Sequence, residues 1–147
     1  MPNEAVFHHG RVLVRLARQV EIALGGVELS LPQYRILGIL GDGSTGASAL
    51  AEKLTVSRPT VTAAVDGLVS KGLVARTTDA RDRRRIHHTL TPEGELALVE
   101  ADRAVSERLE EIAEFLPAEQ RPAAFEGLRL WRTAMDTRRE ARIAARA

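Results

Sequence analysis

Apolar side chains recur at every third or fourth position along most of the chain, which is the spacing of amphipathic helices. Six such stretches are separated by glycine, proline or short polar runs, and the first stops at Gly25-Gly26. The pattern predicts helices over residues 6–24, 31–40, 47–54, 58–71 and 92–112, with a last helix centred on residues 125–135.

Three of these helices carry a start signal. Ser30, Ser57 and Thr91 each precede an apolar run and are followed by a proline within two residues, so each is a candidate N-cap with proline in the first turn. In the last helix, Pro122 would crowd a carbonyl one turn back if the helix began at Ala118. We therefore expect the regular part of that helix to begin later.

Two short segments have a different pattern. Residues 73–77 and 86–90 are β-prone and flank the charged stretch 78–85, which is typical of a hairpin with a polar tip. The predicted fold is therefore mainly α-helical with a small β-hairpin.

Composition limits the classes of protein that the chain can belong to. Its 147 residues, 44% hydrophobic and 28% charged, fit one globular domain with a real core. The absence of cysteine excludes disulfides, thiolate metal sites and thiol sensing. No apolar run reaches the roughly 18 residues of a membrane span, and the N-terminus lacks a signal-peptide pattern. We expect a cytoplasmic protein with no membrane partner.

Charge is unevenly distributed although the net charge is only +1. Residues 55–90 carry seven Arg or Lys against three Asp or Glu, residues 91–127 carry three against ten, and residues 128–147 carry six against two. A basic stretch beside an acidic one suggests one face that meets a polyanion and another that does not.

The order helix, three-residue break, helix and basic hairpin is that of a winged helix-turn-helix. Small Ala51 falls where the two helices cross, and Val61 and Val65 mark the buried side of the second helix. At about 100° per residue, its outward side is small and polar, which suits a major groove about 12 Å wide. The residues predicted to face outward are Thr60, Thr62, Ala63, Asp66, Gly67 and Ser70.

The DNA contacts expected from this helix are few because its outward side chains are short. Its N-terminus offers free N–H groups to phosphates, and Ala63 can touch a thymine methyl. The predicted contact residues are Ser57, Arg58, Thr60, Thr62 and Ala63.

The hairpin tip, Asp79 to Arg85, holds four arginines and two aspartates in seven residues. Arginine on a two-stranded arm can follow phosphates or enter a narrow minor groove. The aspartates can hold particular guanidiniums in place. The predicted contact residues are Arg81, Arg83, Arg84 and Arg85.

Several motifs, in the same order, resemble the MarR family of winged helix-turn-helix transcriptional regulators. They span nearly the whole chain: LPQYRIL at 31–37, LAEKL at 50–54, SRPTVT at 57–62, VDGL at 65–68, KGLV at 71–74, DARDRR at 79–84 and LTPEG at 90–94. The resemblance implies a single domain over residues 1–147, with a winged lobe at 28–92 and dimerisation helices at 5–25 and 93–143.

The same resemblance implies a mode of action. Helix 58–71 of each subunit would lie in a major groove and wing 78–85 in the neighbouring minor groove, with Arg84 as the minor-groove arginine and Asp82 orienting the wing. The chain departs from the family at Ala63 and Gly67, outward positions near which a long basic side chain is common, so we expect few direct hydrogen bonds to bases. Thr55 stands where many such turns use glycine.

A homodimer is expected from chemistry as well as resemblance. One recognition helix discriminates weakly between DNA sequences, and two helices about 34 Å apart multiply that discrimination. Their two-fold arrangement predicts a palindromic duplex operator. The expected interface residues are Val6, Leu13, Leu128, Trp131 and Met135, although Trp131 and Met135 could instead pack within one subunit.

The family further implies a repressor that a small ligand releases from DNA. We place the ligand pocket between the dimer helices and the DNA-binding lobe, near Arg11, Arg15 and Tyr34. No cofactor is expected.

Two alternatives belong to other functional classes. Residues 41–46 read GDGSTG, a GxGxxG pattern, but a dinucleotide-binding enzyme also needs a second parallel strand where helix 58–71 is predicted. A metal-responsive regulator would use the pairs His8-His9 and His87-His88, whose adjacent members point apart. No catalytic constellation or metal-ligand set stands out, so the chain is not expected to be an enzyme.

Overall fold

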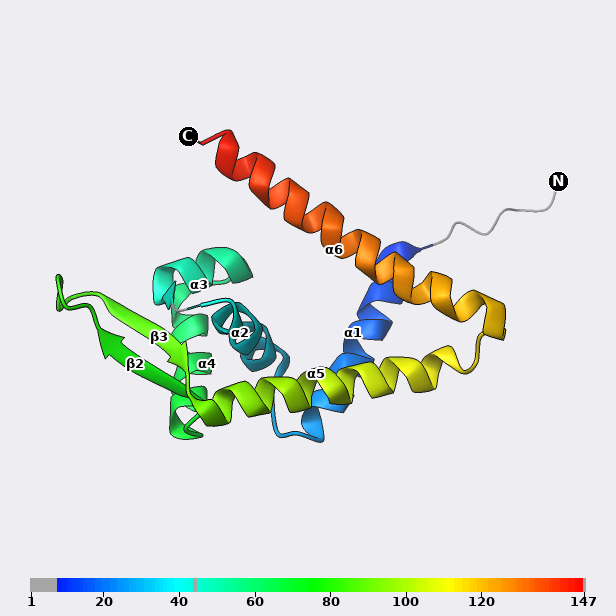
Figure 1. Cartoon of the computed structure of the whole chain (residues 1–147), viewed down its shortest axis with the longest axis horizontal. Coiled ribbons are helices and arrows are strands. Elements are labelled where there is room, and N and C mark those ends of the chain that lie inside the picture. The colour runs from blue at the N-terminus through cyan, green and yellow to red at the C-terminus, as the bar shows by residue number, and fades with distance from the viewer. Residues whose placement is uncertain (1–7, 44, 147) are drawn as a thin grey trace. The chain divides into compact units, whose positions relative to one another are not determined.

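Six α-helices and three short strands make up the part of the chain that the computed structural model describes, residues 8–43 and 45–146 (Figure 1). The chain forms two compact units, Met1–Arg108 and Leu109–Ala147. The elements are α1 (His9–Gly25), α2 (Leu31–Gly41), β1 (Thr45–Gly46), α3 (Ala47–Leu54), α4 (Arg58–Ser70), β2 (Val74–Thr78), β3 (Ile86–Leu90), α5 (Pro92–Ala113), the 3-10 turn η1 (Ala118–Gln120) and α6 (Arg121–Ala144).

The three predicted N-caps are confirmed. Ser30 and Gln33 form a capping box, in which the Gln33 backbone N–H donates to Ser30 Oγ at 3.2 Å and the Ser30 N–H donates to Gln33 Oε1 at 3.1 Å. Ser57 Oγ accepts the N–H of Thr60, and Thr91 Oγ1 accepts the N–H of Gly94. These local bonds begin α2, α4 and α5 at the predicted residues.

The turn between α3 and α4 forms without glycine. Thr55 adopts a left-handed conformation, with φ 56° and ψ 46°, and its N–H donates to Glu52 O at 3.2 Å. Left-handed backbone is unfavourable for a β-branched residue, so this turn is held by the packing of the helices on either side.

The strands form one antiparallel sheet in the order β1-β3-β2. Val74 pairs with Leu90 and Thr78 with Ile86, as the predicted hairpin requires. The sequence predicted two strands and missed β1, which pairs Thr45 with His88. The segment before the 41–46 loop is helix α2, and a dinucleotide fold needs a strand there, so that alternative is wrong on structural grounds.

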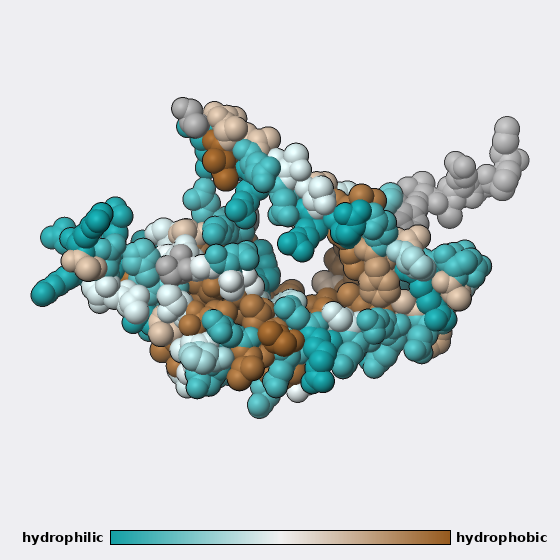
Figure 2. Space-filling view, viewed as in Figure 1, coloured by the Kyte–Doolittle hydropathy of each residue, from teal (hydrophilic) through white to brown (hydrophobic). Residues whose placement is uncertain are grey.

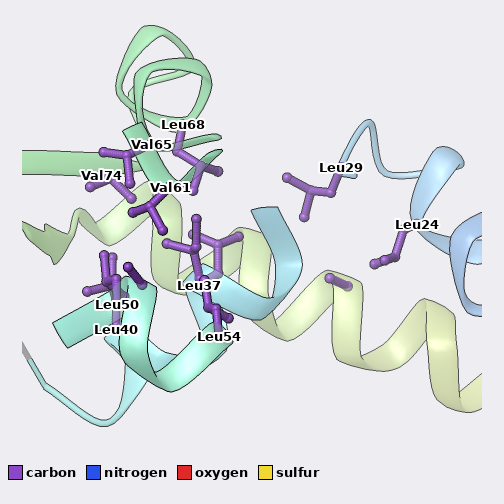
Figure 3. Close-up of a cluster of buried hydrophobic side chains, with 13 residues drawn as sticks. Leu24, Leu29, Leu37, Leu40, Leu50, Leu54, Val61, Val65, Leu68 and Val74 are labelled. Atoms are coloured by element: carbon purple, nitrogen blue, oxygen red, sulfur yellow. The ribbon is translucent and has the colours of Figure 1, made fainter. Parts of the chain in front are cut away.

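The core of the first unit is aliphatic, and most of its buried side chains come from α2, α3 and α4 (Figure 3). It extends to Leu24 on α1, Leu29, Val74 on β2 and Ala101 on α5. Each Leu or Val that is fully buried there stabilises the fold by about 1.5–3 kcal/mol. Ala51 is buried at the α3–α4 crossing, as its small size predicted. The largest side chains with almost no exposure are Leu24, Ile36, Leu37, Leu50, Val61, Val65 and Leu68.

The second unit contains the end of α5, η1 and α6. Pro122 lies in the first turn of α6, where no backbone donor is needed, so the predicted late start of this helix is confirmed. The Arg121 side chain stabilises the preceding turn, since its Nε donates to Leu116 O at 3.2 Å and its Nη2 to Glu114 O at 3.1 Å. None of the described helices combines the length and apolar content needed to cross a bilayer.

Candidate nucleic-acid interface

Helix α4 presents a small polar face to solvent. Thr62 and Ala63 are exposed, whereas Val61, Val65 and Leu68 are buried, as the periodicity predicted. The exposed face carries only short side chains, so it can approach another surface closely.

Gly67 departs from this pattern. A Cβ built on Gly67 would lie 2.8 Å from Gln33 Nε2, so this residue faces α2 and is half-buried. The prediction that it faces outward is wrong, because helical periodicity shows one buried direction and α4 packs on a second neighbour.

The N-terminus of α4 is locally ordered by hydroxyl groups. The hydroxyls of Ser57 and Thr60 lie 2.8 Å apart, while Ser57 Oγ also accepts the Thr60 N–H. Both residues and Arg58 are exposed. The hydroxyl of Thr60 is thus held in one orientation at the end of the helix where the dipole is positive.

The hairpin tip is folded by its two aspartates. Asp79 Oδ1 accepts the N–H of Arg81 at 2.7 Å, and Asp82 Oδ1 accepts the N–H of Arg84 at 3.0 Å. The Arg81 N–H and the His87 side chain hold the pKa of the Asp79 carboxyl below its usual range, because both stabilise the anion. Asp82 also lies 3.8 Å from Arg85 Nε. The tip therefore has a defined shape.

All four tip arginines, at positions 81, 83, 84 and 85, are exposed. The end of the molecule that carries the hairpin is correspondingly hydrophilic (Figure 2, at the left). A strong positive charge is thus placed on an arm with a fixed backbone.

A groove of about 620 Å³ lies between α3, α4 and the sheet. Arg58 and Thr62 line it from α4, and Arg84 and Arg85 line it from the hairpin. The structure therefore brings the two predicted contact regions to one concave surface. Arg81 and Arg83 lie outside the lining, as do Thr60 and Ala63.

Sequence reasoning missed two side-chain pairs beside this groove. Arg76 on β2 bonds to Asp66 on α4, and His87 Nε2 lies 3.3 Å from Asp79 Oδ2. Both pairs join residues that are eight or more positions apart, so no local spacing revealed them. The sequence signal that could have pointed to the Arg76–Asp66 pair is the single carboxylate, Asp66, on the outward face of α4.

Two of the four histidines that suggested a metal site, His87 and His88, have other partners, Asp79 and the carbonyl oxygen of Thr45. His88 is 4% exposed and its Nδ1 lies 3.2 Å from Thr45 O, and burial lowers the pKa of the imidazole. Within residues 8–43 and 45–146, no three His, Cys, Asp or Glu side chains are grouped as metal ligands.

The predicted ligand-binding residues lie in the first unit. Arg11 and Arg15 are exposed on α1, and the Tyr34 hydroxyl donates to Asp102 Oδ1 at 2.6 Å, joining α2 to α5. Burial, followed by the contact with Asp102, raises the pKa of the Tyr34 phenol. None of the three lines the groove described above.

The predicted interface residues that the structure describes are exposed apolar side chains. They are Leu13 on α1 and Leu128, Trp131 and Met135 on α6, of which Trp131 is 68% exposed. Val6 lies outside the described residues.

A short helix, a tight turn, a second helix with a small exposed face and an arginine-tipped hairpin together define a DNA-binding winged helix. Comparisons with known proteins agree. The family model described as the MarR family matches residues 29–86. The transcriptional regulator FarR of Neisseria gonorrhoeae is 32% identical over 106 residues, which are 71% of this chain and 73% of that protein.

Two solved structures have the same fold. The YusO protein of Bacillus subtilis superimposes with a TM-score of 0.69 at 26% identity, covering 84% of this chain and 89% of that one. The transcriptional repressor CouR, bound to a 23-mer DNA duplex, gives a TM-score of 0.69 at 27% identity, covering 82% and 87%. The chain belongs to the MarR family. It is a transcriptional regulator with a DNA-binding winged helix, and not an enzyme.

Proposed function

We propose that the chain acts as a homodimeric repressor that binds a palindromic duplex operator. In each subunit α4 enters a major groove and hairpin tip 78–85 enters the neighbouring minor groove. The observation that carries the proposal is that the exposed face of α4 and the arginine-tipped hairpin border one groove lined by Arg58, Arg84 and Arg85.

Base readout by α4 follows from the size of its side chains. Thr62 offers a hydroxyl to base edges, and the methyl of Ala63 fits against a thymine methyl. Arg58 and the hydroxyl-capped start of the helix are suited to phosphates. We therefore propose few base contacts and a larger number of backbone contacts.

The hairpin supplies most of the positive charge. Because Asp79 and Asp82 bond to backbone N–H groups of the tip, the arm reaches DNA already folded. The enhanced negative potential of a narrow minor groove favours arginine there, and we assign that position to Arg84.

Dimerisation is proposed to use the exposed apolar side chains of α1 and α6. A stripe containing Leu128, Trp131 and Met135 is unfavourable in water and suits a self-complementary interface between two copies. Within the single MarR-like domain over 1–147, residues 28–92 then form the DNA-binding lobe, and residues 5–25 and 93–143 form the dimerisation helices.

Sequencing of genomic fragments retained by the purified protein tests this function. We expect a palindrome with half-sites about ten base pairs apart, and a mass of two subunits in light scattering. Ala63→Glu places a long anionic side chain on the α4 face and should abolish operator selection while the protein stays folded and dimeric. Retained selection by this variant would contradict the placement of α4.

Release by a small ligand is the last part of this proposal, and it rests on the family. Arg11, Arg15 and Tyr34 remain the residues proposed to bind the ligand. A compound that raises the melting temperature of the wild type and dissociates the operator complex should lose both effects in Arg15→Ala. An equal response from that variant would remove Arg15 from the site.

A further inference from the structure

Asp66 is the one carboxylate of α4, and it lies on the face that meets DNA under the proposed function. It follows Thr62 by four residues and Ala63 by three, so the three side chains share one side of the helix. All three are exposed. An unpaired carboxylate on this face would repel phosphates, and its presence therefore needs a physical explanation.

Arg76 provides that explanation. Its Nη2 donates to Asp66 Oδ1, and its backbone is held in the middle of β2 opposite His88 of β3. The pair therefore joins the recognition helix directly to the hairpin. It also places the Arg76 guanidinium in the wall of the groove that Thr62 and Arg84 line.

The position of Arg76 along β2 makes this link important for the hairpin. Val74 is buried and Ala75 half-buried, whereas residues 76–78 are exposed. Packing against the core therefore ends where Arg76 begins. Beyond that point, β2 is joined to α4 by the Arg76–Asp66 pair and to the rest of the sheet by its pairing with β3.

Fold stability does not account for the pair. The Asp66 side chain is 57% exposed and that of Arg76 38%, and exposed ion pairs contribute little to folding. The connection between α4 and β2 is the short turn at residues 71–73, with Gly72 at φ +73°. The hairpin is also anchored through β3, where buried His88 pairs with Thr45 of β1, so the part that can tilt is the outer part beyond these residues.

We propose that Arg76 and Asp66 are a positioning pair that fixes the hairpin relative to α4. This inference rests on the proposed function, in which the pair lets α4 and the arginine tip reach adjacent grooves of one duplex together. Asp66 thereby also meets DNA with its charge already compensated. Neither residue is a DNA contact in this assignment.

Distances within the free protein test the pair without DNA. Because the chain has no cysteine, spin labels can be attached at Ser70→Cys on α4 and Arg83→Cys at the tip. Double electron–electron resonance, on labelled chain diluted with unlabelled chain, should give a broader distribution in Asp66→Asn and Arg76→Gln. The exposed Glu100→Gln on α5 is the matched control and should leave it unchanged. An unchanged distribution in both pair variants would overturn the proposal.

Binding titrations then test the consequence. By fluorescence anisotropy, each single variant should lower operator affinity about threefold to tenfold, and the double variant should lose no more than the weaker-binding single variant. In the double variant, which leaves neither charge unpaired, affinity for an unrelated duplex and the slope of log affinity against log salt should stay unchanged. Arg84→Gln serves as the contrast and should reduce that slope by about one.

Three results would replace the assignment. A reduced salt slope in the double variant would make Arg76 a phosphate contact. Tighter binding of Asp66→Asn to both duplexes would make Asp66 merely repulsive. Weaker binding of Asp66→Asn only at operators with a given cytosine would make it a base reader. If the wild type selects no operator, the proposed function fails, while the distance measurement still decides whether the pair positions the hairpin.

Discussion

Gly94 is the position where one added methyl group should disturb the molecule most. It is buried at the start of α5, and a Cβ there would lie 2.0 Å from the carbonyl oxygen of Leu73 and 2.9 Å from its carbonyl carbon. Thr91 holds the same junction, since its N–H donates to Leu73 O at 3.1 Å and its hydroxyl to Gly72 O at 2.6 Å. The approach of α5 to the α4–β2 turn thus requires glycine.

The cost of Gly94→Ala can be worked from these contacts. An ordinary carbon–oxygen contact needs about 3.3 Å, so the backbones must separate by roughly 1 Å. Overpacking costs about 1–3 kcal/mol, and here the obstacle is backbone, which cannot rotate away. Weakening the two Thr91 hydrogen bonds adds about 1 kcal/mol to this cost. The higher helix propensity of alanine offsets about the same amount. The sum is about 1–3 kcal/mol, and because backbone cannot rotate away we expect a loss of unfolding free energy at the upper end, about 3 kcal/mol.

Thermal denaturation followed by circular dichroism measures this loss. For a chain of this size, about 3 kcal/mol corresponds to a melting temperature lower by roughly 6–12 °C. Gly38→Ala on α2 is the matched control: its added Cβ meets nothing within 4 Å, so the variant should gain up to about 1 kcal/mol. Both must be compared at equal protomer concentration. A Gly94→Ala protein that melts at or above the wild-type temperature would refute the reasoning.

Three other predictions concern the site and its support. Arg84→Ala should weaken operator binding and reduce the log–log salt slope by about one, and unchanged values would remove Arg84 from the minor groove. Trp131→Ala should weaken dimerisation by at least about 2 kcal/mol, roughly thirtyfold in Kd by sedimentation equilibrium; an unchanged Kd would place Trp131 outside the interface. Burial lowers the pKa of His88, so stability is complete above about pH 6.5 and declines below it as the unfolded chain takes up the proton first. Melting temperatures at pH 7 and 5 should differ less in His88→Gln than in the wild type, and a parallel fall would contradict this.

The features that the sequence predicted correctly are local ones. Ser30, Ser57 and Thr91 start helices because each hydroxyl bonds a backbone N–H three residues away, and such spacing is visible in the sequence. The buried side of α4 follows from helical periodicity alone. The order of these elements was then enough to predict the fold class.

The features that the sequence did not predict depend on distant residues. Strand β1 is two residues long and exists because Thr45 and Gly46 pair with β3 more than forty positions away. The close approach of Gly94 to Leu73 and of Gly67 to Gln33 likewise depends on where other elements pack. At the site, the sequence identified the cations and the small helix face, whereas the Arg76–Asp66 link depends on how β2 packs beside α4.

The three aspartates of residues 55–90 show how charge is divided over this surface. Asp79 and Asp82 bond to backbone N–H groups of the tip, and Asp66 bonds to Arg76. Their negative charge therefore serves to shape and orient the hairpin, while the four tip arginines stay exposed to solvent. Attraction to any duplex should then come mainly from the tip and depend strongly on salt, whereas discrimination between sequences should come from the short side chains of α4 and vary little with salt. A variant of Thr62 and a variant of Arg84 should accordingly differ in kind, the first changing which duplex is preferred and the second changing how tightly every duplex is held.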